Sequence, residues 1–232
     1  NIFKKVDKFP QADHLTFVKK SEIFKDPYNI AKYWIKGQKK LKPEGGNVVF
    51  LKTHTPLVTI NNNSFTNDSL SLAIIHVVRD PRDIVVSYSK FMNESYDETI
   101  DRMIADKLTF IFNKSDPLDI EIIGSWKFHY NSWKKGIQSI PRILIRYEDL
   151  LSNTLEEFKK ILSFLSKILN FEINENQLNF CVEASSFANL SKYEKEYGFK
   201  EASRHGGFFF RKGVKDQWKK ELSKSNIKKI EK

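Results

Sequence analysis

Residues able to bind a phosphate group follow directly on an apolar run near the middle of the chain. The run Ile74–Val78 ends at Arg79-Asp80-Pro81-Arg82, and an amphipathic segment that carries Ser87 comes next. This pattern predicts a buried strand leading into a helix, with Pro81 at the first helical position and Asp80 as its cap. Open backbone N–H groups at the helix start, beside two guanidinium groups, favour a phosphate. The segment therefore predicts a multiply phosphorylated small molecule as partner.

A histidine that could act as a base follows a second apolar run. Residues 47–54 read as a buried strand that delivers Lys52, Thr53 and His54 into a loop closed by Pro56. Open α/β sheets bind ligands at the carboxyl ends of their strands, so this loop is a candidate site. Histidine titrates near neutrality, and His54 could accept a proton from a substrate. The alternative is a loop histidine that only hydrogen-bonds to backbone.

Further strands and helices must position these two loops. The segment at residues 142–150 is expected to contain a third strand, which ends at Tyr147. Periodic apolar residues predict helices at residues 26–41, 94–113, 124–137, 154–169 and 174–184, and a basic helix from near Gly213. Residues 185–190 are expected to form a loop and residues 199–210 an irregular segment. Strands that alternate with helices predict an α/β fold with a parallel sheet flanked by helices.

Length, charge and cysteine content narrow the class of protein. The chain has 232 residues, 40% of them hydrophobic, which suits one compact globular domain. A formal net charge of +10 is compatible with an anionic partner and also with a biased background composition. No apolar run approaches the roughly 20 residues of a membrane span and no signal sequence opens the chain, so we expect a cytoplasmic protein. The single Cys181 excludes an internal disulfide and a cysteine metal cluster, and we expect it to be buried in a helix.

Five segments follow one another in the order typical of one enzyme family. They are KTHTP at residues 52–56, VVRDPRDIVVSY at 77–88, GSWKFHYNSW at 124–133, RYEDLL at 146–151 and FFFRKGVKDQWK at 208–219. In this order they resemble the cytosolic type of the sulfotransferase family, which moves a sulfuryl group from 3'-phosphoadenosine 5'-phosphosulfate (PAPS) to an acceptor. RDP or RKG alone would be a weak signal, whereas the combination is specific. The resemblance implies a P-loop NTPase-like sulfotransferase fold in a single domain spanning residues 1–232.

The resemblance gives catalytic roles to the loop at residues 52–56. His54 matches the family's general base, which removes a proton from a hydroxyl or amine acceptor as the acceptor attacks. Lys52 matches an electrostatic stabiliser of the sulfuryl oxygens, and its positive charge should favour the neutral form of His54. No metal is expected, because Lys, Arg and helix N-termini can balance the charge of the transferred group.

The resemblance also implies which residues hold PAPS and its product, 3'-phosphoadenosine 5'-phosphate (PAP). The matching positions are Arg79, Ser87, Arg211, Lys212 and Gly213 for the 3'-phosphate, and Tyr147, Ser185 and Phe187 for the adenine. Arg79 could instead pair with Asp80 or Asp83, and Phe187 could be ordinary core. The family usually has Thr where Ser185 stands, a change that keeps the hydroxyl group.

One segment of the family has no counterpart in residues 1–49. The family opens with a strand and a loop of the kind YPKSGTTW, which grips the 5'-phosphosulfate. Gly45-Gly46 is no substitute, because it precedes a strand and lacks the lysine. We therefore expect a fragment truncated at its N-terminus, without the first βα unit and with little activity by itself.

Two other functions remain open on the sequence. A non-catalytic nucleotide or polyanion-binding protein of the same fold would suit the basic charge, but it gives no role to His54. A kinase would need a GKS/T loop and a magnesium carboxylate arrangement, both of which the sequence lacks. For the enzyme we expect a small-molecule or glycan acceptor, and not nucleic acid. Its pocket is expected to comprise Trp34, residues 57–68, the helix at 94–113 and residues 208–210.

Overall fold

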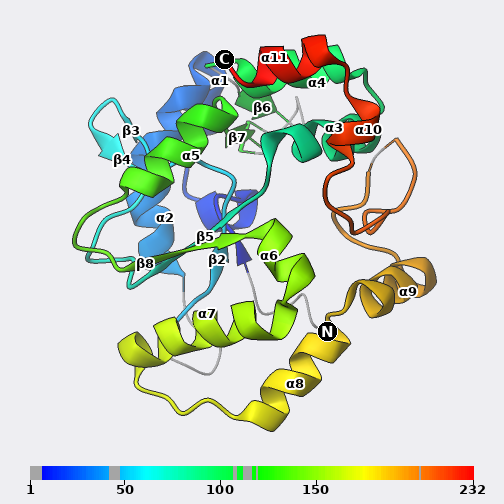
Figure 1. Cartoon of the computed structure of the whole chain (residues 1–232). Helices are drawn as coiled ribbons and strands as arrows, with labels where there is room; N and C mark the ends of the chain where they lie inside the picture. Colours follow the sequence, from blue (N-terminus) through cyan, green and yellow to red (C-terminus); the bar gives the residue numbers. More distant parts are fainter. Residues whose placement is uncertain (1–6, 42–47, 107–108, 112–116, 119, 204) are drawn as a thin grey trace. The chain divides into compact units, whose positions relative to one another are not determined.

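The computed structural model describes residues 7–41, 48–106, 109–111, 117–118, 120–203 and 205–232 (Figure 1). Two units divide the chain. Unit 1 comprises residues 1–72 and 105–141, and unit 2 comprises residues 73–104 and 142–232. Each unit combines helices with short strands, which confirms the predicted α/β class. The single domain expected from the chain length stays a prediction.

Unit 2 is built around two parallel strands. Strand β5 (Ile74–Val78) pairs with β8 (Arg142–Arg146) in register along its whole length, and Figure 1 shows the two side by side. Helices α6 and α7 pack against β8, so the parallel strands are flanked by helices as expected. Val77 of β5 and Leu144 of β8 are 57% and 43% exposed, so β5 is not the buried strand that its apolar run predicts. The helices of unit 2 are α3 (Pro81–Met92), α4 (Tyr96–Ile104), α6 (Tyr147–Ser152), α7 (Thr154–Leu169), α8 (Glu175–Ala184), α9 (Phe187–Tyr197), α10 (Trp218–Glu221) and α11 (Lys224–Ile230).

The start of α3 follows the sequence prediction. Pro81 occupies the first turn, and the Asp80 carboxylate accepts the backbone N–H of Arg82 at 2.9 Å. The helix ends at Asn93, whose φ of +54° is tolerated by asparagine. Its inner face, with Val85 and Val86 fully buried, packs against α4, α10 and α11. These contacts fix the start of α3 directly after the β5 strand.

The described residues of unit 1 form three short strand pairs and an aromatic core. β1 (Asp7–Lys8) pairs with β2 (Leu51–Lys52) in parallel, whereas β3 (Thr59–Ile60) with β4 (Asn63–Ser64) and β6 (Thr109–Ile111) with β7 (Ile120–Ile122) are antiparallel. The ring of Phe65 lies between Trp34 at 5.3 Å and Trp133 at 6.1 Å, both edge-on. The helices are α1 (Lys20–Lys25), α2 (Trp34–Lys40), α5 (Trp126–Lys135) and 3₁₀ turns at Ala12–Leu15 and Pro27–Tyr33.

Several predicted elements have different bounds. The helix expected at residues 94–113 ends at Ile104 and is followed by β6, and the strand expected at 47–54 is reduced to Leu51–Lys52 among the described residues. The loop expected at 185–190 contains the start of α9, because Ser186 caps that helix by accepting the N–H of Asn189. Tyr147 opens α6 rather than ending a strand.

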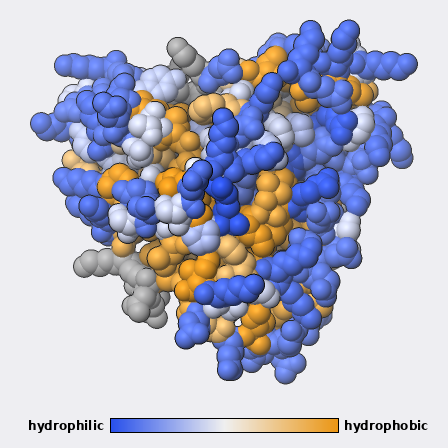
Figure 2. Space-filling model, turned by 60° about the vertical axis from the view of Figure 1, so that its left-hand side comes forward, coloured by the Kyte–Doolittle hydropathy of each residue, from blue (hydrophilic) through white to orange (hydrophobic). Residues whose placement is uncertain are grey.

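Two side chains lie elsewhere than expected. Trp34 was predicted to line an acceptor pocket, but it is completely buried in the core of unit 1, against Phe65. Cys181 was predicted to be buried, but it is exposed on α8. Apolar side chains also reach the surface, as the orange areas among hydrophilic residues in Figure 2 show. None of the described helices combines the length and the apolarity that crossing a bilayer requires.

Candidate active site

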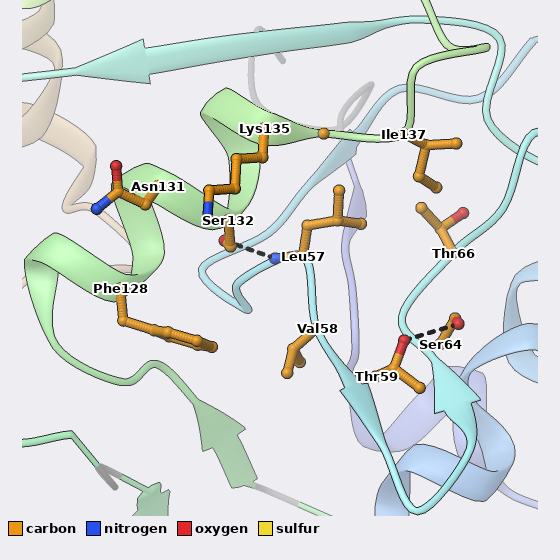
Figure 3. Close-up of a pocket in the computed structure, with 11 residues that line it drawn as sticks. Leu57, Val58, Thr59, Ser64, Thr66, Phe128, Asn131, Ser132, Lys135 and Ile137 are labelled. Carbon is orange, nitrogen blue, oxygen red and sulfur yellow. Dashed lines mark hydrogen bonds between the residues drawn. The ribbon is translucent and has the colours of Figure 1, made fainter.

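The loop that carries His54 is fixed to helix α5 of unit 1. Thr55 is buried, and its carbonyl accepts the ring N–H of Trp133 at 3.1 Å. The backbone N–H of Leu57 donates to the hydroxyl of Ser132 at 3.0 Å, as Figure 3 shows. These bonds hold the backbone on the C-terminal side of His54, whose side chain is 43% exposed. An accessible imidazole on a fixed loop is suited to proton transfer.

A buried carboxylate that the sequence analysis missed contacts this histidine. Oε2 of Glu121 on β7 lies 3.2 Å from Nδ1 of His54, and Lys8 on β1 forms an ion pair with the other carboxylate oxygen. Burial by itself would raise the pKa of Glu121, but the hydrogen bonds and charges of His54 and Lys8 outweigh burial and hold this pKa below its ordinary value. Lys52 lies half-buried at the end of β2.

A pocket of about 440 Å³ lies beside the same loop in unit 1 (Figure 3). The predicted acceptor segment at residues 57–68 forms one wall, where the hydroxyl groups of Thr59 and Ser64 hydrogen-bond at 2.9 Å. Helix α5 forms the other wall, with Phe128 and Asn131. His54 is not among the residues that line this pocket, so the location of the pocket does not by itself make it the site at which His54 would accept a proton.

In unit 2, Arg79 leaves the end of β5 and contacts two segments far away in the sequence. Its guanidinium carbon lies 4.3 Å from the centre of the Tyr147 ring, and its Nη2 donates to the carbonyl of Val214 at 3.3 Å. Its Nε atom is buried and has no hydrogen-bond partner among the described residues. A buried unpaired donor of this kind is costly unless a ligand satisfies it.

The two aspartates considered as alternative partners of Arg79 are engaged elsewhere. Asp80 binds Arg82, with an Nη2 to Oδ2 distance of 2.7 Å. Asp83 is 1% exposed and accepts the backbone N–H groups of Asp216 at 2.7 Å and Trp218 at 3.1 Å. Arg79 therefore keeps its charge available, and Asp83 anchors the segment that follows Gly213.

A second buried carboxylate anchors the other end of that segment. Glu194 on α9 is 4% exposed and accepts the backbone N–H groups of Phe209 at 2.6 Å and Phe210 at 2.8 Å. Residues 211–215 thus lie between two anchor points, Glu194 and Asp83. Such anchoring limits the conformations of a segment that is otherwise without regular structure.

We expect Asp83→Asn to reduce the free energy of unfolding by about 1–3 kcal/mol, because the amide offers one acceptor oxygen to two N–H groups. Urea denaturation followed by circular dichroism measures this change. Asp216→Asn is the matched control: in the described structure the exposed side chain of this aspartate pairs only with Lys219, and we expect a change within about 0.5 kcal/mol. Equal effects of the two substitutions would contradict an anchoring role for Asp83.

Gly213 lies directly against the ring of Phe187. Its φ is +60°, and a Cβ atom at this position would lie 2.4 Å from Cδ2 of that ring. Phe187 is 37% exposed, so it is not ordinary core. Only glycine fits both this conformation and this close approach, which gives the ring a flat backbone surface on one side.

Replacing Gly213 with alanine tests this contact. Gly207 is the matched control, since its φ is +90° but nothing lies within 4 Å of its Cβ position. Both alanine variants should lose about 1–2 kcal/mol to the left-handed backbone. We expect a further loss only for Gly213→Ala, measured by urea denaturation, and equal losses would show that the ring does not press on this glycine.

The remaining predicted nucleotide residues make other contacts in unit 2. Arg211 donates to Gln217 at 3.2 Å, and Lys212 pairs with Glu221 at 3.3 Å. The hydroxyl of Ser185 donates to the carbonyl of Cys181 at 2.7 Å, and Ser87 lies half-buried on α3. The structure thus brings Arg79, Tyr147, Phe187 and the 213–214 segment into a chain of contacts. Arg211 is linked to this chain through Gln217, whose side chain donates to the carbonyl of Val214 at 3.4 Å.

Comparison with known proteins identifies the family. The family model described as "Sulfotransferase domain" matches residues 13–232, which include most of both units. The chain belongs to the sulfotransferase family. Its relatives include Sulfotransferase 1 family member D1 of Mus musculus, 28% identical over 197 residues, and Sulfotransferase 6B1 of Danio rerio, 31% identical over 163 residues. These matches cover 78% and 68% of this chain but 59% and 49% of the relatives, so the chain spans about half the length of these sulfotransferases.

Solved sulfotransferase structures share the fold. A mouse sulfotransferase in complex with PAP superposes with a TM-score of 0.58 at 17% identity, covering 97% of this chain and 80% of that one. Retinol dehydratase in complex with androsterone and inactive cofactor PAP gives a TM-score of 0.57 at 17% identity, covering 95% of this chain and 66% of that one. The predicted sulfotransferase fold is therefore confirmed.

Proposed function

We propose that the protein transfers a sulfuryl group from PAPS to the hydroxyl or amine group of a small-molecule or glycan acceptor. Family membership supports this class of reaction, because the named relatives are sulfotransferases. In this proposal His54 is the general base and Lys52 stabilises the sulfuryl oxygens. The accessible imidazole on a fixed loop supports the first of these roles.

The observation that carries the proposal is the contact network of Arg79 in unit 2. The guanidinium group contacts Tyr147, a predicted adenine residue, and Val214, which directly follows the predicted phosphate residue Gly213. Phe187 joins them through Gly213. The buried, unpaired Nε of Arg79 fits a ligand that brings an oxygen acceptor, such as a phosphate. The partly exposed rings of Tyr147 and Phe187 fit a flat aromatic base.

Each residue then has a physical task. PAPS, when bound, supplies the sulfuryl group. Arg79 offers a charged donor to the 3'-phosphate, together with Arg211 and Lys212, which would exchange their contacts with Gln217 and Glu221 for it. Ser87 would add a hydroxyl donor on α3, and Ser185, two positions before Phe187 in the sequence, would offer its hydroxyl to the adenine. Gly213 allows backbone N–H groups to approach the phosphate closely.

Two measurements with the full-length protein test the proposal. Isothermal titration calorimetry measures PAP binding, and radiolabelled PAPS measures transfer to a panel of phenols, steroid and retinoid alcohols, amines and glycans. We expect PAP to bind and at least one acceptor class to be labelled. Binding without any transfer would favour the non-catalytic nucleotide binder, and the absence of PAP binding would overturn both assignments.

A further inference from the structure

The buried carboxylate of Glu121 contacts the partly exposed imidazole of His54 across a long stretch of sequence. The two residues are 67 positions apart, and Oε2 lies 3.2 Å from Nδ1. Glu121 is 5% exposed in the middle of β7, and all three residues of this strand are buried. A carboxylate is rarely retained in such a place without polar partners. Its contact with His54 is therefore a structural feature of unit 1 and not a chance surface contact.

The second oxygen of this carboxylate is also occupied. The ammonium group of Lys8 binds Oε1. Lys8 lies on β1 opposite Lys52 of β2, and β2 leads directly into the loop of His54. Each carboxylate oxygen thus has its own partner, so Glu121 cannot rotate without breaking one of these two contacts.

Glu121 is ionised at neutral pH. Its burial opposes the charge, but the hydrogen bonds and charges of His54 and Lys8 lower its pKa below the ordinary value. An ionised carboxylate only accepts hydrogen bonds. The ring nitrogen that faces it must therefore carry the proton.

We propose that Glu121 is a positioning residue that holds His54 as the Nδ1–H tautomer, with the lone pair of Nε2 directed away from the carboxylate and toward the acceptor. This inference rests on the proposed function, because the lone pair matters only if His54 is the base. In the reaction the acceptor O–H or N–H bond breaks, its electron pair forms a bond to sulfur, and the proton forms an Nε2–H bond. The bond between sulfur and the 5'-phosphate oxygen of PAPS breaks at the same time, and its electron pair leaves on PAP. The imidazolium that results is stabilised by the adjacent carboxylate.

Glu121→Gln removes this control with little change of shape. The amide can present its NH₂ group to Nδ1, which favours the opposite tautomer. We expect two-bond proton–nitrogen correlation spectra to show a population of Nε2–H tautomer, and kcat to fall by about 100-fold, within the range that general-base catalysis contributes. The acceptor KM and the PAP affinity should stay unchanged. Lys8→Gln is the matched control, because it removes the other carboxylate contact and should leave the Nδ1–H tautomer in place.

The wild-type protein already provides a decisive measurement. A dominant Nε2–H tautomer of His54 in its spectrum overturns the inference, whether or not any variant folds. A folded Glu121→Gln protein that keeps its kcat overturns it as well. If the wild-type protein transfers no sulfuryl group, the proposed function fails, while the tautomer spectra still decide whether Glu121 controls the ring.

Discussion

Replacing His54 with alanine is expected to slow sulfuryl transfer by about 10²- to 10⁴-fold, the range that a general base contributes. The substitution removes the proposed proton acceptor but none of the residues proposed to hold the nucleotide. PAP affinity should therefore stay the same, and the partly exposed side chain can be removed without loss of the fold. Transfer from radiolabelled PAPS and titration calorimetry with PAP measure the two quantities on one preparation.

His205→Ala is the control for this experiment, since it removes an exposed histidine to which no role is assigned. It should change neither quantity. Unchanged transfer in His54→Ala would remove this histidine from the reaction and favour a different base. Loss of PAP binding together with transfer would mean that the substitution disturbs the protein more widely, and circular dichroism spectra would show whether the fold is retained.

Elements defined by local signals could be predicted from the sequence. The bounds of β5 follow from a β-branched run, and the start of α3 follows from Asp80 and Pro81. Helix α7 begins and ends where its apolar period does. In each case the residues that determine the element lie within a few positions of one another, so the prediction does not depend on residues far away in the sequence.

Elements defined by distant partners could not be predicted in this way. The apolar periodicity of residues 94–104 continues into the next apolar segment, so the sequence predicts one helix as far as residue 113. In the structure that segment contains β6, which pairs with β7. A short apolar run fits a strand and a helix equally well, and pairing decides between them. At α9 a local signal did exist: Ser186 before Phe187 is a helix cap, and it was overlooked.

The candidate site shows the same division. The order of the motifs predicts Arg79, Tyr147 and Gly213 as nucleotide-binding residues. It does not predict that Arg79 contacts Val214, which lies 135 positions away in the sequence. Glu121 carried only a weak signal, a single carboxylate within an apolar strand. The role proposed for it follows only from the fold, which places it beside His54.

Arg79→Ala is expected to weaken PAP binding by about 10- to 150-fold, because hydrogen bonds to charged groups contribute about 1.5–3 kcal/mol. The loss should depend on the 3'-phosphate. Adenosine 5'-phosphate lacks that group, so its affinity should change little between wild type and variant. Titration calorimetry with both nucleotides separates the charge effect of Arg79 from its contact with the Tyr147 ring, which serves both ligands equally.

Arg82→Ala is the matched control, because Arg82 lies three positions after Arg79 and its guanidinium group is held by contacts within the protein. It binds Asp80 and Glu231, and its guanidinium carbon lies 3.8 Å from the centre of the Trp218 ring. Its removal should lower the Tm and leave the affinity for PAP unchanged, since none of its charge is free for a ligand. An equal loss of affinity for PAP and adenosine 5'-phosphate in Arg79→Ala would contradict a phosphate contact, because the guanidinium group would then act through Tyr147 or the fold alone.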